Sequence, residues 1–222
     1  MHPVPTRPAV PVDASARGWA WAGVIAGLLG PAVLLGTAGI YAQEAWDSGD
    51  NTALAGSIAD HTAVVWAHQA AGFALAALLI VFGLGLRRRL APAGGLGADV
   101  AAAGVLLTAV AVFLGAGLDT ELWWAVQPGS TSDPDTVGAL LAGYSTIGWL
   151  WGGLAVSAAA VAYSGFARGT VGRAVAWASA LLAVVVVATQ VFPVQYISIV
   201  PGGLWLAVIA IWALRRGARS AD

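Results

Sequence analysis

Six long apolar stretches constrain this chain more than any other feature of its sequence. They lie near residues 18–42, 61–86, 99–118, 137–165, 174–192 and 197–214. A helix needs roughly 20 apolar residues to cross a hydrocarbon core, and each span must satisfy its own backbone N–H and C=O groups because lipid offers them no partners. Barrel strands would alternate polar and apolar residues, and these runs do not. The sequence therefore predicts an all-α fold, a polytopic transmembrane bundle of six helices.

The composition agrees with a membrane protein. Of the 222 residues, 59% are hydrophobic and only 9% are charged, whereas a soluble domain usually carries about 25% charged residues. The chain has too few charges to build a polar shell, so we expect a multi-pass protein of the plasma (inner) membrane with the lipid bilayer as its partner. The net charge of −1 gives no general attraction to nucleic acid, and no nucleic-acid partner is expected.

The distribution of charge predicts the orientation of the bundle. With six spans, every arginine falls on the side of the N-terminus, and most of the acids fall on the other side. The arginines are at positions 7, 17, 87–89, 168, 173, 215, 216 and 219. Short loops rich in arginine stay in the cytoplasm. We therefore expect both termini to be cytoplasmic.

Three regions follow from these patterns. Residues 1–17 are rich in proline and small residues and predict a disordered cytoplasmic tail. Residues 18–214 form the six-helix transmembrane domain, and 215–222 a basic cytoplasmic tail. A signal peptide at the first span is disfavoured, because its apolar region would be only about 7–15 residues long. Between the last two spans, Pro193 and Pro201 predict a turn, and the last helix reaches across the membrane if it begins at Ile197.

Two glycine pairs have the four-residue spacing that lets helices approach closely in membranes. They are Gly23 with Gly27, and Gly148 with Gly152. Small-residue faces of this kind suit packing within one bundle, and they also suit a second copy of the chain or another membrane protein as a partner.

Two segments carry a resemblance to a known group of proteins. GLDTELWWAV (117–126) and VFPVQYISIVPGGLW (191–205) resemble segments of small six-helix membrane proteins of actinobacteria. The resemblance extends over most of the chain after the first tail. It implies the topology and the compartment, but no activity.

Polar residues within the spans are few, and they gather toward the predicted outer half. An ionisable group inside a bilayer is costly and marks a functional hypothesis. His68 is the deepest such group, and Gln69 and Tyr144 lie at a similar predicted depth. Imidazole ordinarily titrates near about pH 6.5, so His68 is the natural proton carrier. The three residues are candidates for ligand binding or proton handling, although His68 also suits a structural role as a buried, hydrogen-bonded imidazole.

A second candidate site combines His61, Asp119 and Glu121 at the predicted span ends. Imidazole and carboxylates suit zinc or a similar divalent ion. The alternative is that all three are solvated residues at the membrane surface. His61 and His68 cannot both bind one haem, because two residues on the same face of one helix cannot approach the ring from opposite sides.

Three classes of function fit these residues. The first is a non-enzymatic subunit, scaffold or accessory factor, which the absence of any complete catalytic motif favours. The second is a small transporter or ligand-binding protein with an outward-facing pocket around His68. The third is a metal-dependent membrane enzyme that faces the periplasm. Because the chain has no cysteine, thiol chemistry is excluded, and no cofactor is predicted.

Overall fold

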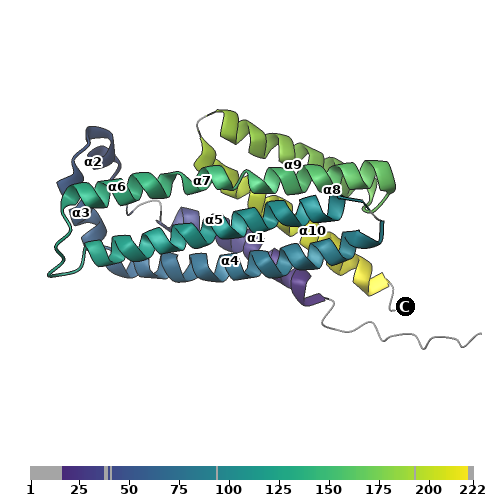
Figure 1. Ribbon diagram of the computed structural model, residues 1–222, viewed down its shortest axis with the longest axis horizontal. Coiled ribbons are helices and arrows are strands. Elements are labelled where there is room, and N and C mark those ends of the chain that lie inside the picture. The colour runs from purple at the N-terminus through teal and green to yellow at the C-terminus, as the bar shows by residue number, and fades with distance from the viewer. Residues whose placement is uncertain (1–16, 38–39, 41, 94, 193, 220–222) are drawn as a thin grey trace, which may run out of the picture.

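The computed structural model describes residues 17–37, 40, 42–93, 95–192 and 194–219. Within these ranges the chain is helical and has no β-strand (Figure 1), which confirms the predicted all-α class. Five helical segments are long and apolar enough to cross a membrane, as a multi-pass membrane protein requires. They are Thr62–Ala93, Gly97–Ala125, Pro134–Arg168, Arg173–Val191 and Gln195–Arg215. The described apolar part of the first helix, Gly18–Val33, is shorter.

The helices follow the predicted apolar stretches, with shifted ends. The long ones are α1 (Gly18–Thr37), α4 (Thr62–Leu90), α5 (Gly97–Ala125), α8 (Gly153–Arg168), α9 (Arg173–Val191) and α10 (Ile199–Arg219). α5 continues seven residues beyond the predicted end at 118, which brings Asp119 into the helix. Pro201 lies in the first turn of α10, where a missing N–H costs no helical hydrogen bond. The tail predicted for residues 1–17 lies, except for Arg17, outside the described residues.

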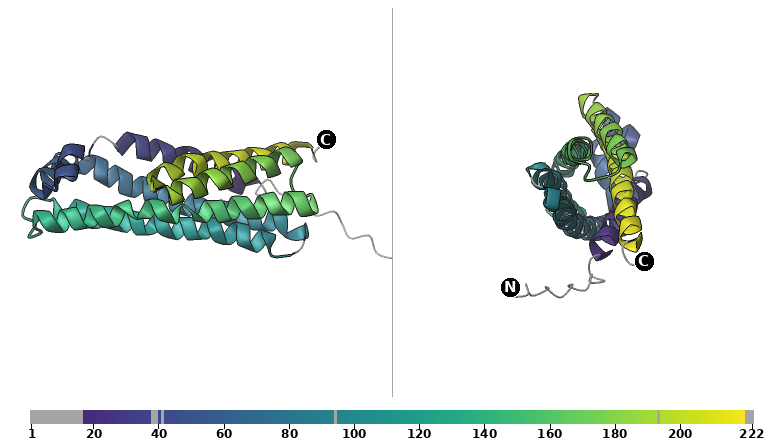
Figure 2. Two further views of the ribbon diagram at one scale, coloured as in Figure 1. Left: turned by 90° about the horizontal axis from the view of Figure 1, so that it is seen from above. Right: turned by 90° about the vertical axis from the view of Figure 1, so that its right-hand side faces the viewer.

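The long helices form a ring. In the order α1, α4, α5, α8, α9 and α10, each helix packs against the next, and α10 closes the ring against α1 (Figure 2). Neighbours in sequence are thus neighbours in space, as short connections favour. A ring of this kind encloses an axial space that side chains must fill or leave hollow.

Two short helices, α2 (Gln43–Ser48) and α3 (Asn51–Ala59), occupy most of the segment between the first two predicted spans. Gly49 has a φ of 72°, a left-handed conformation that glycine adopts without strain and that ends α2. The carboxylate of Asp50 then caps α3 by accepting hydrogen bonds from the N–H groups of Thr52 and Ala53. Both helices lie at one end of the bundle (Figure 1).

The predicted fourth span is an interrupted helix. It consists of α6 (Pro134–Ser145), α7 (Ile147–Leu150) and α8. Where these helices join, several backbone bonds run between residues three apart, as from Trp151 N to Gly148 O and from Leu154 N to Trp151 O. Tighter winding of this kind inside a helix often marks a functional hinge.

The ring closes tightly where α1 crosses α10. A Cβ atom on Gly27 would lie 2.5 Å from the carbonyl oxygen of Gly203, and a Cβ atom on Gly203 would lie 2.6 Å from the carbonyl oxygen of Gly27. Only glycine allows the two backbones to come so close. Of the predicted pairs, Gly23 and Gly27 therefore face α10 or α4, whereas Gly148 lies against the backbone of Tyr196.

The interior is packed in two separate clusters. The larger one fills the bundle with side chains such as Phe82, Leu154 and Trp205, all less than 2% exposed. The smaller one lies under α2 and α3 and includes Ile58, Leu122 and Val137. We call the end of the bundle that carries α2 and α3 the acidic end, because Glu44, Asp47, Asp50, Asp133 and Asp135 are exposed there.

The opposite end carries arginine. Arg87, Arg88 and Arg89 form the last turn of α4, and Arg168 ends α8 and donates to the carbonyl oxygen of Ala93 in the connection to α5. The guanidinium of Arg89 lies 5.4 Å from the ring centre of Trp212, so α10 ends here too. We call this the arginine end. Most of the described acids and the described arginines therefore lie at opposite ends of the bundle, and Asp99, 2.7 Å from Arg87 Nε at the arginine end, departs from this pattern.

Candidate binding cavity

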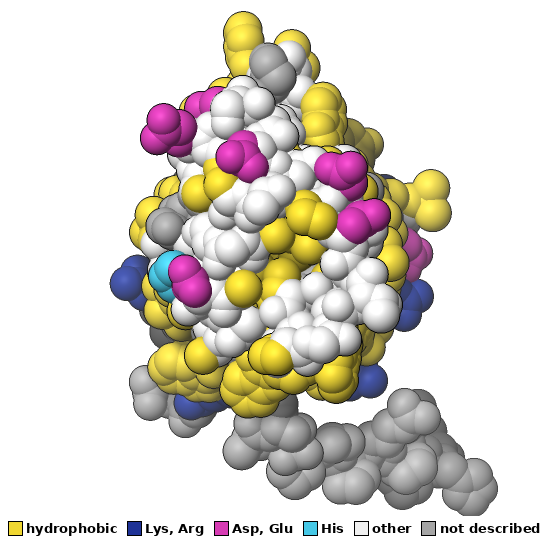
Figure 3. Space-filling model, turned by 90° about the vertical axis from the view of Figure 1, so that its left-hand side faces the viewer, with side chains coloured by type: hydrophobic (Ala, Val, Ile, Leu, Met, Phe, Trp, Pro, Cys, Tyr) yellow, Lys and Arg dark blue, Asp and Glu magenta, His cyan; other side chains and the backbone are white. Residues whose placement is uncertain are grey.

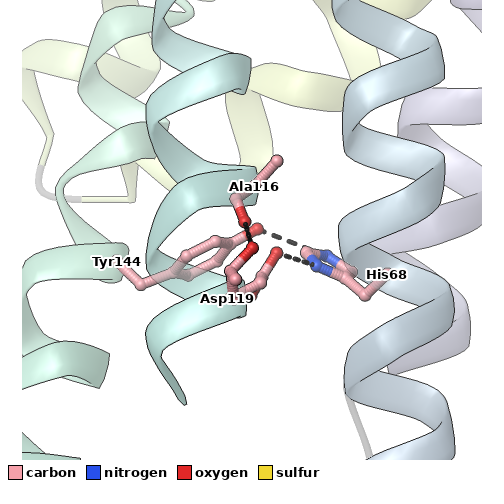
Figure 4. A network of polar contacts seen from close by, with 5 residues as sticks. His68, Ala116, Asp119 and Tyr144 are labelled. Carbon is pink, nitrogen blue, oxygen red and sulfur yellow. Dashed lines mark hydrogen bonds and ion pairs between the residues drawn. The ribbon is translucent and has the colours of Figure 1, made fainter. Parts of the chain in front are cut away.

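A chain of hydrogen bonds joins three helices in the interior of the bundle. His68 Nδ1 on α4 lies 2.7 Å from Asp119 Oδ2 on α5, and His68 Nε2 lies 3.2 Å from the hydroxyl of Tyr144 on α6. The rings of His68 and Tyr144 meet edge to face, with centroids 5.6 Å apart (Figure 4). Both ring nitrogens of His68 thus have a partner, and its orientation is set by side chains on two other helices.

The side chains that form this hydrogen-bond chain are largely shielded from solvent. The Asp119 side chain is 3% exposed and the His68 side chain 11%. A buried carboxylate is costly unless it is paired and hydrogen-bonded, and His68 supplies that partner. An ionised Asp119 can only accept, so Nδ1 of His68 donates to it.

Whether the Tyr144 hydroxyl donates to His68 or accepts from it depends on the protonation state of the imidazole. When the imidazole is neutral, Nε2 accepts the Tyr144 O–H. When it is protonated, Nε2 carries a hydrogen and donates to the phenolic oxygen, and the hydroxyl proton then points away from Nε2. Protonation of His68 therefore reverses the direction of the hydrogen bond between His68 and Tyr144.

The three residues border a cavity of about 470 Å³. Ligand-binding pockets typically occupy about 300–1,000 Å³. The wall is mostly apolar and includes Gly72, Leu75, Val112, Ile147 and Ile199. The cavity lies between the two packed clusters, because small residues on α4 and α5 leave the space empty at this height. It reaches the acidic end, where Gln43 and Trp46 of α2 form part of its wall.

The helical hairpin explains why His68 and Asp119 meet. α4 and α5 are antiparallel neighbours joined by the connection 91–96. His68 precedes this connection by 23 residues, and Asp119 follows it by 23 residues. Residues at equal distances from a tight turn lie at the same height on two antiparallel helices. This symmetry is present in the sequence, but a predicted helix end at 118 places Asp119 with His61 at the span ends, and the longer α5 corrects that grouping.

The interrupted helix borders the same cavity. Gly148 lies in its wall, and the Gly148 carbonyl oxygen accepts from the Ser198 hydroxyl at 3.2 Å and from Gln190 Nε2 at 3.5 Å. The Oε1 atoms of Gln190 and Gln195 are buried without a partner among the described residues. The Gly148 carbonyl oxygen in the interrupted stretch is therefore hydrogen-bonded by polar side chains on α9 and just before α10.

Gln69 does not share the cavity with His68. It lines a separate depression beside Trp66, Phe73, Phe113 and Thr120, on the faces of α4 and α5. Successive residues of a helix point about 100° apart, and α5 stands between these two directions. The structure therefore brings His68 and Tyr144 together and leaves Gln69 out.

The grouping of His61, Asp119 and Glu121 is not found in the structure. His61 is exposed, and its Nδ1 lies 2.7 Å from the Ser57 carbonyl oxygen. Glu121 is exposed as well, while Asp119 is buried and faces His68. Within the described ranges, no three His, Asp or Glu side chains come close enough to hold a metal ion. Asp119 is also not the solvated residue that we considered as the alternative.

Comparisons with known proteins provide no relative from which to infer an activity. No protein-family model matches the chain, and no curated protein or solved structure is significantly similar to it. The resemblance to actinobacterial six-helix proteins therefore stays a prediction.

Proposed function

We propose that this protein is a small membrane transporter or ligand-binding protein whose site is the cavity around His68, Asp119 and Tyr144. The observation that carries the proposal is a hollow of about 470 Å³ with a buried, hydrogen-bonded carboxylate in its wall. An apolar pocket with a few convergent polar groups is the usual form of a small-molecule site. A subunit or scaffold, the first of our expected functions, has no need of such a hollow.

The interruption of the fourth span supports transport in particular. Transporters commonly bind their cargo beside broken helices near the middle of the membrane. Here Gly148 and Trp151, both in the interrupted stretch, lie in the cavity wall. A hinge at this position allows α6 to move relative to α8 and so to change access to the cavity.

We also propose six spans with both termini in the cytoplasm. The support is that α1 has 20 residues, packs against α4 and α10 as a sixth member of the ring, and begins at the arginine end beside Arg17. Arginine-rich ends face the cytoplasm. The acidic end and the mouth of the cavity then face the outside of the cell.

Native mass spectrometry of the protein in lipid nanodiscs tests the proposed site. A stoichiometric small-molecule adduct is expected for the wild type. Val112→Phe should remove it, because Val112 lines the cavity and a phenyl group takes up the space that the ligand needs. The matched control is Val110→Phe, because Val110 on the same helix is 55% exposed on the outer surface. Equal adducts in both variants, or none in the wild type, would count against the cavity as a binding site.

A further inference from the structure

The charge of the cavity wall restricts the ligand, provided that the proposed binding function holds. The wall contains one carboxylate, Asp119, and one imidazole, His68, and its described residues include no arginine and no lysine. Its net charge is therefore −1 when His68 is neutral and 0 when His68 is protonated. A site that is never positive disfavours anions and favours cations or neutral molecules.

The aromatic residues of the wall favour a cation further. Trp46, Tyr144, Trp151 and Tyr196 line the cavity from four different parts of the chain: α2, α6, the interruption before α8, and the turn before α10. Faces of aromatic rings attract organic cations, and the attraction is stronger where the cation is removed from water. Aromatic rings on several sides with one carboxylate match a lipophilic cation better than a neutral hydrocarbon.

The entrance to the cavity is negatively charged, like its wall when His68 is neutral. Glu44 and Asp47 on α2 and Asp133 and Asp135 at the start of α6 are exposed at the acidic end. Figure 3 shows this end, with acidic side chains around a hollow that has apolar side chains in it. Acids around an entrance raise the local concentration of cations.

The proton on His68 competes with such a cation. Asp119 is the one described acid that faces His68, at 2.7 Å, and the other titratable groups among the described residues of the wall are Tyr144 and Tyr196. Two positive charges beside a single carboxylate repel each other in an apolar surrounding, so a bound cation disfavours the protonated imidazole. The released proton leaves through the mouth of the cavity to water.

We infer that the cavity binds a lipophilic organic cation, and that this cation exchanges for the proton that the protonated imidazole of His68 carries on Nε2. In a transporter, such exchange couples the movement of the cation to a proton moving in the opposite direction. The site thus has one negative charge that either a proton or a cation neutralises.

Three probes of similar size and different charge test the inference. They are methyltriphenylphosphonium, neutral triphenylphosphine oxide, and tetraphenylborate. Binding to the full chain in nanodiscs is measured by calorimetry near pH 6 in two buffers with different ionisation enthalpies, which reveals proton release. The cation should bind about tenfold or more tightly than the neutral probe and should release up to one proton, while the anion should not bind.

Two variants separate charge from folding. Asp119→Asn should weaken cation binding about tenfold or more yet keep the neutral probe, and that remaining binding shows that the variant is folded. His68→Gln should bind the cation without releasing a proton. Glu121→Gln, which removes an exposed acid outside the cavity wall, is the control and should behave like the wild type.

The outcomes distinguish this inference from the proposed function. If the neutral probe binds as tightly as the cation, or if the cation binds without proton release, the cavity remains a binding site and the ligand class is wrong. If none of the three probes binds and no adduct is found by mass spectrometry, the proposed function itself fails.

Discussion

His68 Nδ1 on α4 lies 2.7 Å from Oδ2 of Asp119 on α5, and the carboxylate side chain is only 3% exposed. Each group satisfies the other in a place that water hardly reaches. Removal of one partner leaves the other buried with an unmatched charge or hydrogen bond, which costs more than the pair itself contributes. The pair is therefore a stability determinant as well as the proposed ligand contact.

Asp119→Ala should lower the free energy of unfolding by about 3 kcal/mol or more. His68→Ala combined with Asp119→Ala should cost less than the sum of the two single changes, because neither partner is then left alone. Titration with sodium dodecyl sulfate in mixed micelles measures these values. Asp135→Ala, which breaks an exposed hydrogen bond to Asn51, is the control and should change stability by about 0.5 kcal/mol or less. Additive costs for the pair would contradict the coupling.

Gly27→Ala should destabilise the bundle by about 1–3 kcal/mol. The added methyl group would lie 2.5 Å from the Gly203 carbonyl oxygen, so α1 and α10 must separate. Gly117→Ala is a matched control, because its methyl group would have no atom within 4 Å and alanine is the better helix former by about 1 kcal/mol. Thermal unfolding in one detergent should rank Gly117→Ala at or above the wild type and Gly27→Ala below it.

Ser179→Ala should cost about 1–2 kcal/mol. The Ser179 hydroxyl accepts a hydrogen bond from Trp205 Nε1 at 3.1 Å, and both side chains are buried. Without that acceptor the indole N–H has no partner in the contact between α9 and α10. Ser145→Ala removes an exposed hydroxyl that bonds within its own helix and should leave the unfolding midpoint nearly unchanged. Equal midpoints for both variants would show that the buried bond contributes little.

The start of α6 should depend on pH through Asp133. The backbone N–H and the side chain of Thr136 hold the pKa of the Asp133 carboxyl below its usual 3.8. A lowered folded-state pKa adds stability that is fully present above pH 3.8 and is lost as the pH falls through the folded-state pKa. The stability difference between the wild type and Asp133→Asn should thus be constant above about pH 5 and shrink below the usual pKa. A difference that does not change down to the lowest pH studied would contradict this role.

Single cysteines can test the orientation directly, because the chain contains none. We expect Ser132→Cys, before α6 at the acidic end, to react with a membrane-impermeant maleimide in intact cells. Ala93→Cys, in the connection at the arginine end, should react only after the cells are opened. Both positions are exposed, so reactivity reports the side of the membrane. The opposite pattern would invert the bundle and place the cavity mouth in the cytoplasm.

Local sequence was sufficient for the class of the fold. Apolar stretches of span length predict helices because lipid leaves a backbone no other way to satisfy its hydrogen bonds, and α4 and α9 follow the predicted stretches closely. The separation of most acids from the arginines could also be predicted, because the side on which each residue lies depends only on the number of spans that precede it. Local patterns did not predict α2 and α3, whose limits are set by the left-handed Gly49 and by capping of α3 by Asp50.

The sequence by itself determined that the chain is an all-helical membrane-type bundle with opposite charges at its two ends, because these properties follow from the composition and order of short segments. Only the tertiary structure decided that His68 meets Asp119 and Tyr144, that Gln69 points elsewhere, and that a cavity remains between two packed clusters. These depend on how far each helix is rotated about its axis and on which small residues leave space unfilled. Such rotations are set by contacts between helices, which no single segment contains.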